Sequence, residues 1–458
     1  MSAQPSEIEV ACERAVSAAL DAGAGDAEAF AEDSTSFSAE VFEGEVESLT
    51  EAGSRGLGVR VWIDGRAGYA YATDLSDDGI RATASDAVAA ARIADPDRFA
   101  AAPEPSTEPY TTERFLDDSF FGWVPQQKLD LARRVEAVAL ASGRIEAVES
   151  THYADEVSNV AIRSSRGVSG AYTATASYAY LQAIASDGAD RQTGLGFGMG
   201  RTPETLDPEA IGAEAATRAA ALLGASKPKS RTCPVVLDPT VAASFAGFIG
   251  GLLSADSVQR GRSPFAGRLG EPIAAELLTL VDDGTAPGGL ASSPFDAEGT
   301  PAGRTALIES GVLGAYLHDS YTARREGDGV PSTANAGRAG FRSAPAVGPT
   351  NLIVEPGAEL SFDDLLIEAG GGVLITDVSG LHSGVNPVSG QFSVGATGRL
   401  ISAGGEPSDP IDEFTIASDL QSMLRAITSI GSEPRWVPFG GSVSTPAILV
   451  GEMAIGGS

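Results

Sequence analysis

Two hydrophobic periodicities alternate along the first part of the chain, and their order limits the folds that it can adopt. Residues 6–22 repeat apolar side chains every three or four positions, as an amphipathic helix does, with Ser6 placed to cap it. From residue 27 to residue 73 the repeat changes to two, which is typical of strands. The helical repeat returns over Asp77 to Ile93. This order predicts antiparallel sheet flanked by helices.

A tight hairpin is predicted within the strand-like region. Asp64 and Gly65 form a pair that tolerates the positive φ angles of a two-residue turn. We expect apolar residues before the turn to lie opposite apolar residues after it: Val59, Val61 and Ile63 opposite Ala67, Tyr69 and Tyr71.

The order of helix, strands and helix recurs after a proline-rich stretch. Four prolines between residues 95 and 109 exclude a helix or a central strand there and predict a linker. Helical patterns then cover residues 125–142 and 208–223, with strand-like residues 146–199 between them. The recurrence suggests two related sub-units within one N-terminal layer.

The length of 458 residues also favours more than one domain, because single cores stop growing near roughly 250–300 residues. We predict an N-terminal α+β domain over residues 1–226, made of sub-units 1–95 and 118–226 around the linker. A hinge follows at residues 227–230. A β-rich C-terminal domain is predicted over residues 231–458.

The second half is rich in glycine, proline and short β-prone runs. Residues 234–237 and 372–377 are expected to be strands. Two helices are expected among them, over residues 240–253 and 412–425, and we expect them to cover a curved sheet.

Composition excludes several classes of function. The formal net charge of −31, with only three lysines, argues against nucleic-acid binding. No stretch approaches the ~20 apolar residues of a membrane helix, and the first residues lack a secretory signal, so a cytoplasmic protein is expected. Cys12 and Cys233 alone provide neither a disulfide framework nor a multi-cysteine metal site.

Known catalytic motifs are absent. The three histidines, His152, His318 and His382, are isolated, and neither HExxH nor HExxxH occurs. The serine-hydrolase motif GxSxG and the phosphate-binding motif GxxxxGK[ST] are missing too. No metal site, nucleotide site or nucleophile is therefore predicted from motifs.

Polar side chains gather among glycines in two regions, residues 316–338 and 380–393. Such loops usually line a groove, so we expect them to face a substrate or a partner. The alternative is that they form turns and core packing. The candidate residues are His318, Asp319, Arg324, Asn335, Arg338, His382 and Asn386.

These segments resemble the TldD/PmbA family. Tyr-Leu-His-Asp-Ser-Tyr at residues 316–321, Ser-Thr-Ala-Asn-Ala-Gly-Arg at 332–338 and Gly-Val-Asn-Pro-Val-Ser-Gly at 384–390 match three family elements in order. Residues 56–71 also resemble the N-terminal hairpin of the family, so the resemblance covers nearly the whole chain. It implies an N-terminal α+β domain and a C-terminal β-rich domain that curls into a barrel-like half-shell.

The resemblance also distinguishes two branches. The catalytic TldD branch carries HExxxH on a helix and a zinc-binding cysteine near the C-terminus. Here Ala246, Gly247 and Gly251 occupy the HExxxH position, and Gly431 and Ser432 stand where the cysteine is expected. The resemblance therefore places the chain in the TldE/PmbA branch, with no metal of its own and zinc expected in a TldD-type partner.

The function that this implies is that of a non-catalytic subunit in a TldD/TldE peptidase system that cleaves unstructured peptides. The partner is a TldD-type chain or a second copy. Two alternatives stay open. One is a homodimeric hydrolase that uses His318, Asp319 and His382 instead of HExxxH. The other is a homodimer that binds peptides at exposed sheet edges without chemistry.

Overall fold

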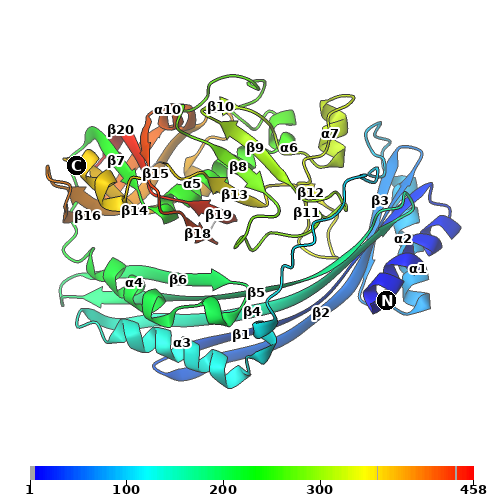
Figure 1. Ribbon diagram of the computed structural model, residues 1–458, viewed down its shortest axis with the longest axis horizontal. Helices are drawn as coiled ribbons and strands as arrows, with labels where there is room; N and C mark the ends of the chain where they lie inside the picture. The colour runs from blue at the N-terminus through cyan, green and yellow to red at the C-terminus, as the bar shows by residue number, and fades with distance from the viewer. Residues whose placement is uncertain (1–5, 358, 439–440) are drawn as a thin grey trace.

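The computed structural model describes residues 6–357, 359–438 and 441–458. A long, curved, antiparallel sheet forms one layer, and the C-terminal half of the chain lies against its concave face (Figure 1). The central pair is formed by β1 and β4, which run antiparallel from Glu28 opposite Ser164 to Val41 opposite Thr151. In spatial order the strands are β3 (Arg66–Ala72), β2 (Glu45–Ile63), β1 (Asp26–Phe42), β4 (Ile145–Ser164), β5 (Ser169–Ser186) and β6 (Arg191–Gly200).

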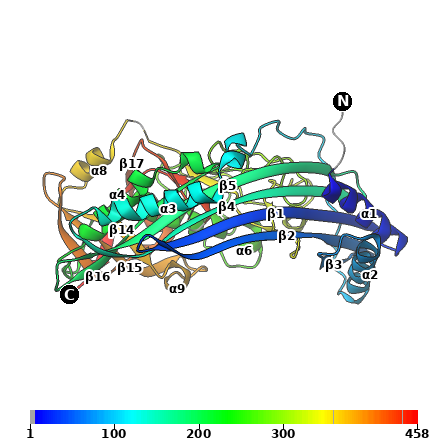
Figure 2. The same cartoon turned by 90° about the horizontal axis from the view of Figure 1, so that it is seen from below.

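Two copies of one motif build this sheet. The first contributes a helix, strands β1 to β3 and a helix, and the second contributes a helix, strands β4 to β6 and a helix. The helices lie towards opposite ends of the sheet (Figure 2). They are α1 (Glu7–Asp21), α2 (Asp77–Ile93), α3 (Pro125–Leu140) and α4 (Pro208–Ala220).

Strand β1 shows how the two faces of the sheet differ. Ala27, Ala29 and Ala31 are buried in one core with α1 and α2, because successive side chains of a strand point to opposite faces. Phe30, between them, packs in a separate cluster with Phe295 of the C-terminal half. One face of the sheet therefore carries the helices, and the other carries the C-terminal half.

The predicted turn at Asp64 and Gly65 is confirmed, with φ angles of 49° and 73°. The predicted facing residues are wrong. Because the loop has two residues, Ile63 pairs with Arg66, and the paired positions follow from that. Val61 and Val59 lie opposite Gly68 and Ala70, whereas Ala67, Tyr69 and Tyr71 lie opposite Trp62, Arg60 and Gly58.

A closed barrel forms the centre of the C-terminal half. β7 and β14 pair in parallel, so the strands expected at residues 234–237 and 372–377 are neighbours. Pairing of β16 with β20 closes the barrel. Its strands are β7 (Arg231–Leu237), β14 (Val373–Ser379), β15 (Gln391–Ile401), β16 (Pro407–Asp419) and β20 (Ile448–Gly456), and β17 (Ile427–Ile430) pairs with β20.

The helix expected over residues 412–425 is wrong in its first part. Residues up to Asp419 belong to β16, and only α10 (Leu420–Arg425) is helical. The buried residues Ile411 and Phe414 are three positions apart because Glu413 adopts a φ of 54° and the register with β15 shifts nearby. That spacing imitates a helical repeat.

A second sheet packs beside the barrel, and helix α5 contacts strands of both. In spatial order its strands are β10 (Val312–Leu313), β9 (Arg304–Glu309), β8 (Leu280–Asp283), β13 (Asn351–Val354), β19 (Ser442–Thr445) and β18 (Arg435–Val437). β11 (Ala336–Gly337) and β12 (Ala346–Val347) form a separate pair. The remaining helices are α5 (Pro239–Leu252), α6 (Ala255–Gln259), α7 (Ser320–Glu326), α8 (Phe362–Glu368) and α9 (Leu381–Gly384).

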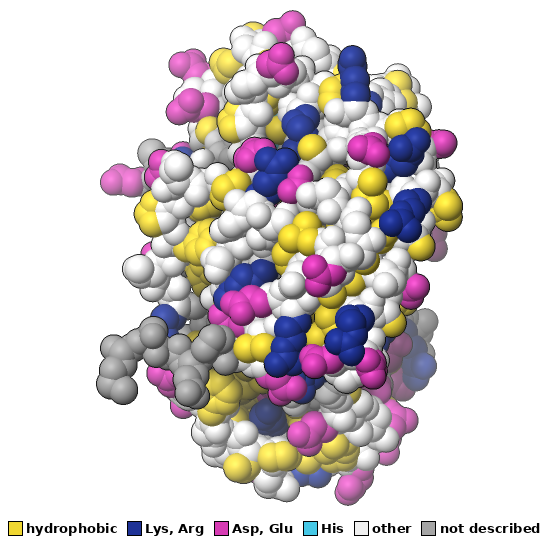
Figure 3. Space-filling view, turned by 90° about the vertical axis from the view of Figure 1, so that its right-hand side faces the viewer, with side chains coloured by type: hydrophobic (Ala, Val, Ile, Leu, Met, Phe, Trp, Pro, Cys, Tyr) yellow, Lys and Arg dark blue, Asp and Glu magenta, His cyan; other side chains and the backbone are white. Residues whose placement is uncertain are grey.

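The predicted α+β class, with an antiparallel N-terminal sheet and a barrel-like C-terminal region, is thus confirmed. No helix in the described part of the chain has the length and apolar character needed to cross a membrane. On the face seen in Figure 3, acidic and basic side chains are interspersed with apolar ones.

Candidate functional site

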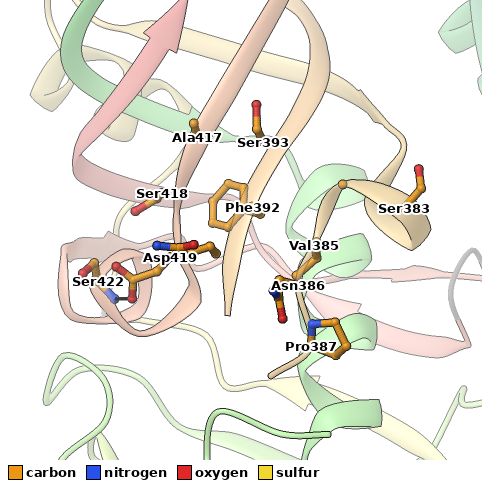
Figure 4. A pocket seen from close by; sticks show the side chains of 12 residues that line it. Ser383, Val385, Asn386, Pro387, Phe392, Ser393, Ala417, Ser418, Asp419 and Ser422 are labelled. Carbon is orange, nitrogen blue, oxygen red and sulfur yellow. Dashed lines mark hydrogen bonds between the residues drawn. The ribbon is translucent and has the colours of Figure 1, made fainter. Parts of the chain in front are cut away.

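A groove of about 1000 Å³ lies on the outside of the barrel, where the loop after β14 meets the ends of β15 and β16. Ser383 and Asn386 lie on one side of Phe392, and Ser418, Asp419 and Ser422 lie on the other (Figure 4). Hydroxyl and amide groups thus dominate its polar lining. A groove of this kind can accept hydrogen bonds from, and donate them to, a flexible polar chain.

Hydrogen bonds within the loop fix its shape. The Asn386 carboxamide oxygen accepts bonds from the backbone N–H groups of Val388 and Ser389, at 2.9 and 3.2 Å. The backbone N–H of Asn386 donates to the carbonyl of Gln391 at 2.8 Å. Gly390, with a φ of 76°, completes the turn into β15. The loop is therefore an ordered wall of the groove.

The floor of the groove connects it to helix α5. Phe392 is buried, and its ring lies 5.3 Å from the ring of Phe245, measured between centroids. The next residue along α5, Ala246, faces a small cavity of about 30 Å³ whose lining is entirely apolar. Asp238 caps the helix by accepting a bond from the N–H of Val241 at 2.8 Å.

The candidate residues around α7 form a second cluster. The buried backbone carbonyl of His318 accepts bonds from the N–H groups of Thr333 and Asn335, at 3.1 and 3.4 Å. Asp319 caps α7, since one carboxylate oxygen accepts from both the N–H and the hydroxyl of Thr322, at 2.7 Å each. The carboxylate of Asp319 therefore binds its own helix and is not placed to orient the ring of His318.

Burial governs the protonation of both residues. It lowers the pKa of His318, whose Nδ1 has no hydrogen-bond partner within the described residues. Burial, together with the negative charge of Glu298, raises the pKa of Asp319. The neutral imidazole is thus the favoured form of His318.

Asn335 ties this cluster to the second sheet. Its Nδ2 donates to Asp282 Oδ2 at 2.7 Å, and its Oδ1 accepts from the hydroxyl of Thr333 at 2.7 Å. Asp282 also accepts from the N–H of Thr350 at 2.7 Å. Burial raises the pKa of Asp282 to about 6 despite these donors.

Arg338 and Arg324 join separate layers of the molecule. Arg338 pairs with Glu28 of β1, and only 2% of the Arg338 side chain and 1% of the Glu28 side chain is exposed. Arg324 donates to the backbone carbonyls of Phe99 and Ala101, at 2.9 and 2.8 Å, and so fastens the proline-rich linker to α7.

The buried pair extends into a charge cluster. Arg60 of β2 donates to Glu28 at 2.8 Å and to Glu298 at 2.9 Å. Glu298 in turn accepts from the N–H of Ser320, the first residue of α7, at 2.9 Å. Burial alone would raise the pKa of Glu298, but Arg60 and Ser320 outweigh it and lower that pKa. We call Glu28, Arg60, Glu298 and Arg338 the interlayer cluster.

Comparison with known proteins covers nearly the whole chain. Models of the PmbA/TldA metallopeptidase match it with domain 1 over residues 27–91, the central domain over 119–223 and the C-terminal domain over 230–457. The metalloprotease PmbA of Escherichia coli O157:H7 is 31% identical over 451 residues, which cover 97% of this chain and 96% of that protein. The chain belongs to the PmbA/TldD metallopeptidase family. The family predicted from the sequence is confirmed.

Solved structures agree with this family fold. A protein of Thermotoga maritima MSB8 superposes with a TM-score of 0.88 at 29% identity, over 98% of this chain and 100% of that one. TldE from Thermococcus kodakarensis gives a TM-score of 0.90 at 23% identity, over 98% and 100% of the two chains. At that identity the second likeness supports the fold alone.

The residues expected at the HExxxH position do not fit a zinc ion. Ala246, Gly247 and Gly251 carry no side-chain donor atom. Ser432, near the expected cysteine, donates its hydroxyl to the carbonyl of Leu360 at 2.9 Å. In residues 6–357, 359–438 and 441–458, no three His, Cys, Asp or Glu side chains are grouped so that they could hold a metal.

The candidate residues thus fall into two places. Five of them lie on helix α7 or in segments near it: His318, Asp319, Arg324, Asn335 and Arg338. The other two belong to the loop after β14, where Asn386 lines the groove and His382 is exposed on α9. Whether any of them contacts a substrate or a partner stays a prediction.

Sequence reasoning missed most of the interlayer cluster. Glu28 stands between Ala27 and Ala29 in a strand, and Glu298 follows Asp296 by two positions. A charged residue within an apolar, alternating strand is a signal for a buried ion pair, but nothing in the sequence names its partner.

Proposed function

We propose that this chain is the zinc-ligand-lacking subunit of a TldD/TldE-type peptidase system that acts on unstructured peptides. Its partner is a TldD-type chain that supplies the zinc, and the pair works in the cytoplasm. The observation that carries the proposal is the replacement of donor side chains by Ala246, Gly247 and Gly251 on α5. A chain with this helix has no means of activating a zinc-bound water there.

The groove gives this subunit a role in handling the peptide. Its floor residue Phe392 packs on Phe245, one residue before the family's HExxxH position, so the groove adjoins the helix that bears the ligands in the TldD branch. In the assembled pair, we expect the loop with His382 and Asn386 to face substrate or the partner. The residues around α7 instead join the C-terminal half to the N-terminal sheet.

Association with the partner is the direct test. The chain should co-elute with a TldD-type chain from the same organism in size-exclusion chromatography with light scattering, at a mass equal to the sum of both. We expect a matched mixture with the TldD-type histidines changed to alanine to co-elute as well. Elution of the two chains as separate species, or as homodimers only, would contradict the proposal.

The domain division is part of the same proposal. We propose domains at residues 1–226 and 231–458, with sub-units 1–95 and 118–226 in the first. The bounds of the three matching family models, 27–91, 119–223 and 230–457, support it. Limited proteolysis should cut first near residues 227–230, and initial cuts inside the barrel would contradict the division.

A further inference from the structure

A second cleft, of about 840 Å³, separates helix α4 from the barrel. Most of its lining comes from strand β6, from α4 and from barrel strands β14, β15 and β16, and the starts of α5 and α8 contribute to it. These elements face one another across the molecule on the left of Figure 1. The first groove lies instead among the loop after β14 and the ends of β15 and β16, so the two sites have different lining residues.

Ion pairs join α4 to the C-terminal half at this cleft. Arg218 of α4 bonds Asp238 at 2.9 Å and Glu214 at 3.0 Å, and Arg435 bonds Glu214 at 2.5 Å. Arg218 also donates to the carbonyl of Thr376 in β14 at 3.2 Å. Two guanidinium groups therefore balance two carboxylates, and the pairs fix the spacing between α4 and the barrel.

Two other carboxylates in the cleft are not balanced in this way. Neither Asp377 nor Asp412 forms an ion pair with any described residue. The adjacent Arg399 directs its guanidinium to the carbonyls of Pro407 and Ser408, at distances from 2.8 to 3.1 Å. Partial burial raises the pKa of Asp377; the backbone N–H of Val378 and the charge of Arg218 oppose that shift, and the nearby Asp412 charge adds to it. Two carboxylates without an ion-pair partner among the described residues therefore lie at this end of the cleft.

The outer edge of the N-terminal sheet runs along the same cleft. Strand β6 is the last strand of its sheet, and its residues Gln192 to Leu195 line the cleft. Helix α4 sits directly on one face of β6, since a Cβ added at Gly194 would lie 2.2 Å from the backbone nitrogen of Ala219. An edge strand offers N–H and C=O groups to an extended chain, and Leu195 and Leu374 add apolar contact surface.

We propose that this cleft binds an extended peptide segment with a lysine or arginine side chain, whose backbone follows β6 and whose cation lies between Asp377 and Asp412. The inference rests on the proposed function, because it assigns the peptide of that system a docking site on the non-catalytic subunit. Charge complementarity selects a basic segment over an acidic one.

Peptide binding to the purified full-length chain tests this site. Fluorescence anisotropy would compare labelled, unstructured peptides that differ only in a central lysine, norleucine or glutamate. The lysine peptide should bind roughly three- to tenfold more tightly than the norleucine peptide, as expected for a partly desolvated ion pair. The double variant Asp377→Asn with Asp412→Asn should remove that preference and leave norleucine binding unchanged.

The matched control is Asp363→Asn, which removes an exposed carboxylate on α8, outside the cleft. It should keep the full lysine preference, and thermal unfolding should show that both variants are folded. Equal binding of the lysine and norleucine peptides, no binding of either, or an unchanged preference in the double variant would overturn the inference. These outcomes are read on the chain alone, so they are separate from loss of association with a TldD-type chain, which would overturn the proposed function.

Discussion

Arg338 carries its charge in a site that water hardly reaches, and its stability there depends on Glu28. Without Arg338, the two buried carboxylates of Glu28 and Glu298 would share the single positive charge of Arg60, so the cluster would keep one uncompensated negative charge. Loss of one partner from a buried ion pair costs about 3–5 kcal/mol. Arg338→Met keeps a long apolar side chain over Phe30, whose ring lies 4.7 Å from the guanidinium carbon. We predict that this variant loses stability of that order in urea denaturation.

Arg81→Met is the matched control. Arg81 also pairs with an aspartate, Asp78, but 63% of its side chain and 94% of that of Asp78 is exposed. Exposed pairs contribute about 0–1 kcal/mol, so the control should denature close to the wild type. Equal denaturation midpoints for Arg338→Met and Arg81→Met would contradict the role of the interlayer cluster.

Asp282 makes a second prediction at the residue scale. Its pKa of about 6 in the folded chain lies above the usual value of 3.8, so the folded state binds its proton more tightly than the unfolded state. The stability that comes from this proton is present below pH ~4 and is lost as the pH rises to about 6. Wild type should therefore lose stability relative to Asp282→Asn across that window. A constant difference in denaturation midpoint from pH 4 to pH 7 would contradict the assignment.

Contacts between elements depend on the glycines of β6. A Cβ added at Gly196 would lie 2.0 Å from the backbone carbonyl oxygen of Ile211, so α4 would have to move. Gly196→Ala should therefore cost about 1–3 kcal/mol or more, measured by thermal unfolding. Gly53→Ala is the control, since its added Cβ would meet only the carbonyl oxygen of Ser34 at 3.9 Å. Similar unfolding temperatures for the two variants would show that α4 does not pack tightly on β6.

Most elements could be predicted because their signals are local. The helical repeat over residues 77–93 corresponds to α2, and that over 125–142 to α3 with its proline start. A helix was wrongly predicted over residues 412–419 because a bulge at Glu413 changes the spacing of the buried residues. A hydrophobic repeat alone cannot reveal a bulge. The faces of the hairpin were misassigned because pairing depends on the length of the turn.

The candidate site was predicted only in part. Family resemblance located both loops, but whether His318 is buried or His382 is exposed depends on packing between distant elements. The bond between Arg338 and Glu28 spans 310 positions in the chain, so no local pattern could indicate it. The two clefts also require the folded arrangement, since each is lined by segments far apart in sequence.

In the whole molecule, two sheet repeats form a curved layer that the interlayer cluster fastens to a barrel-centred half. The α5 helix, where we expect the family's metal position, is apolar and contacts the groove through Phe245 and Phe392. From this arrangement we propose a subunit that contacts the peptide and leaves the hydrolytic step to its partner.

The central claim is tested most directly by zinc content and cleavage of an unfolded peptide, measured for this chain alone, for the TldD-type chain alone and for the mixture. The account predicts no cleavage by this chain alone, cleavage by the mixture, and zinc that follows the TldD-type chain. Cleavage by this chain alone, or zinc bound to it in stoichiometric amount, would contradict the account and place a catalytic centre within this chain.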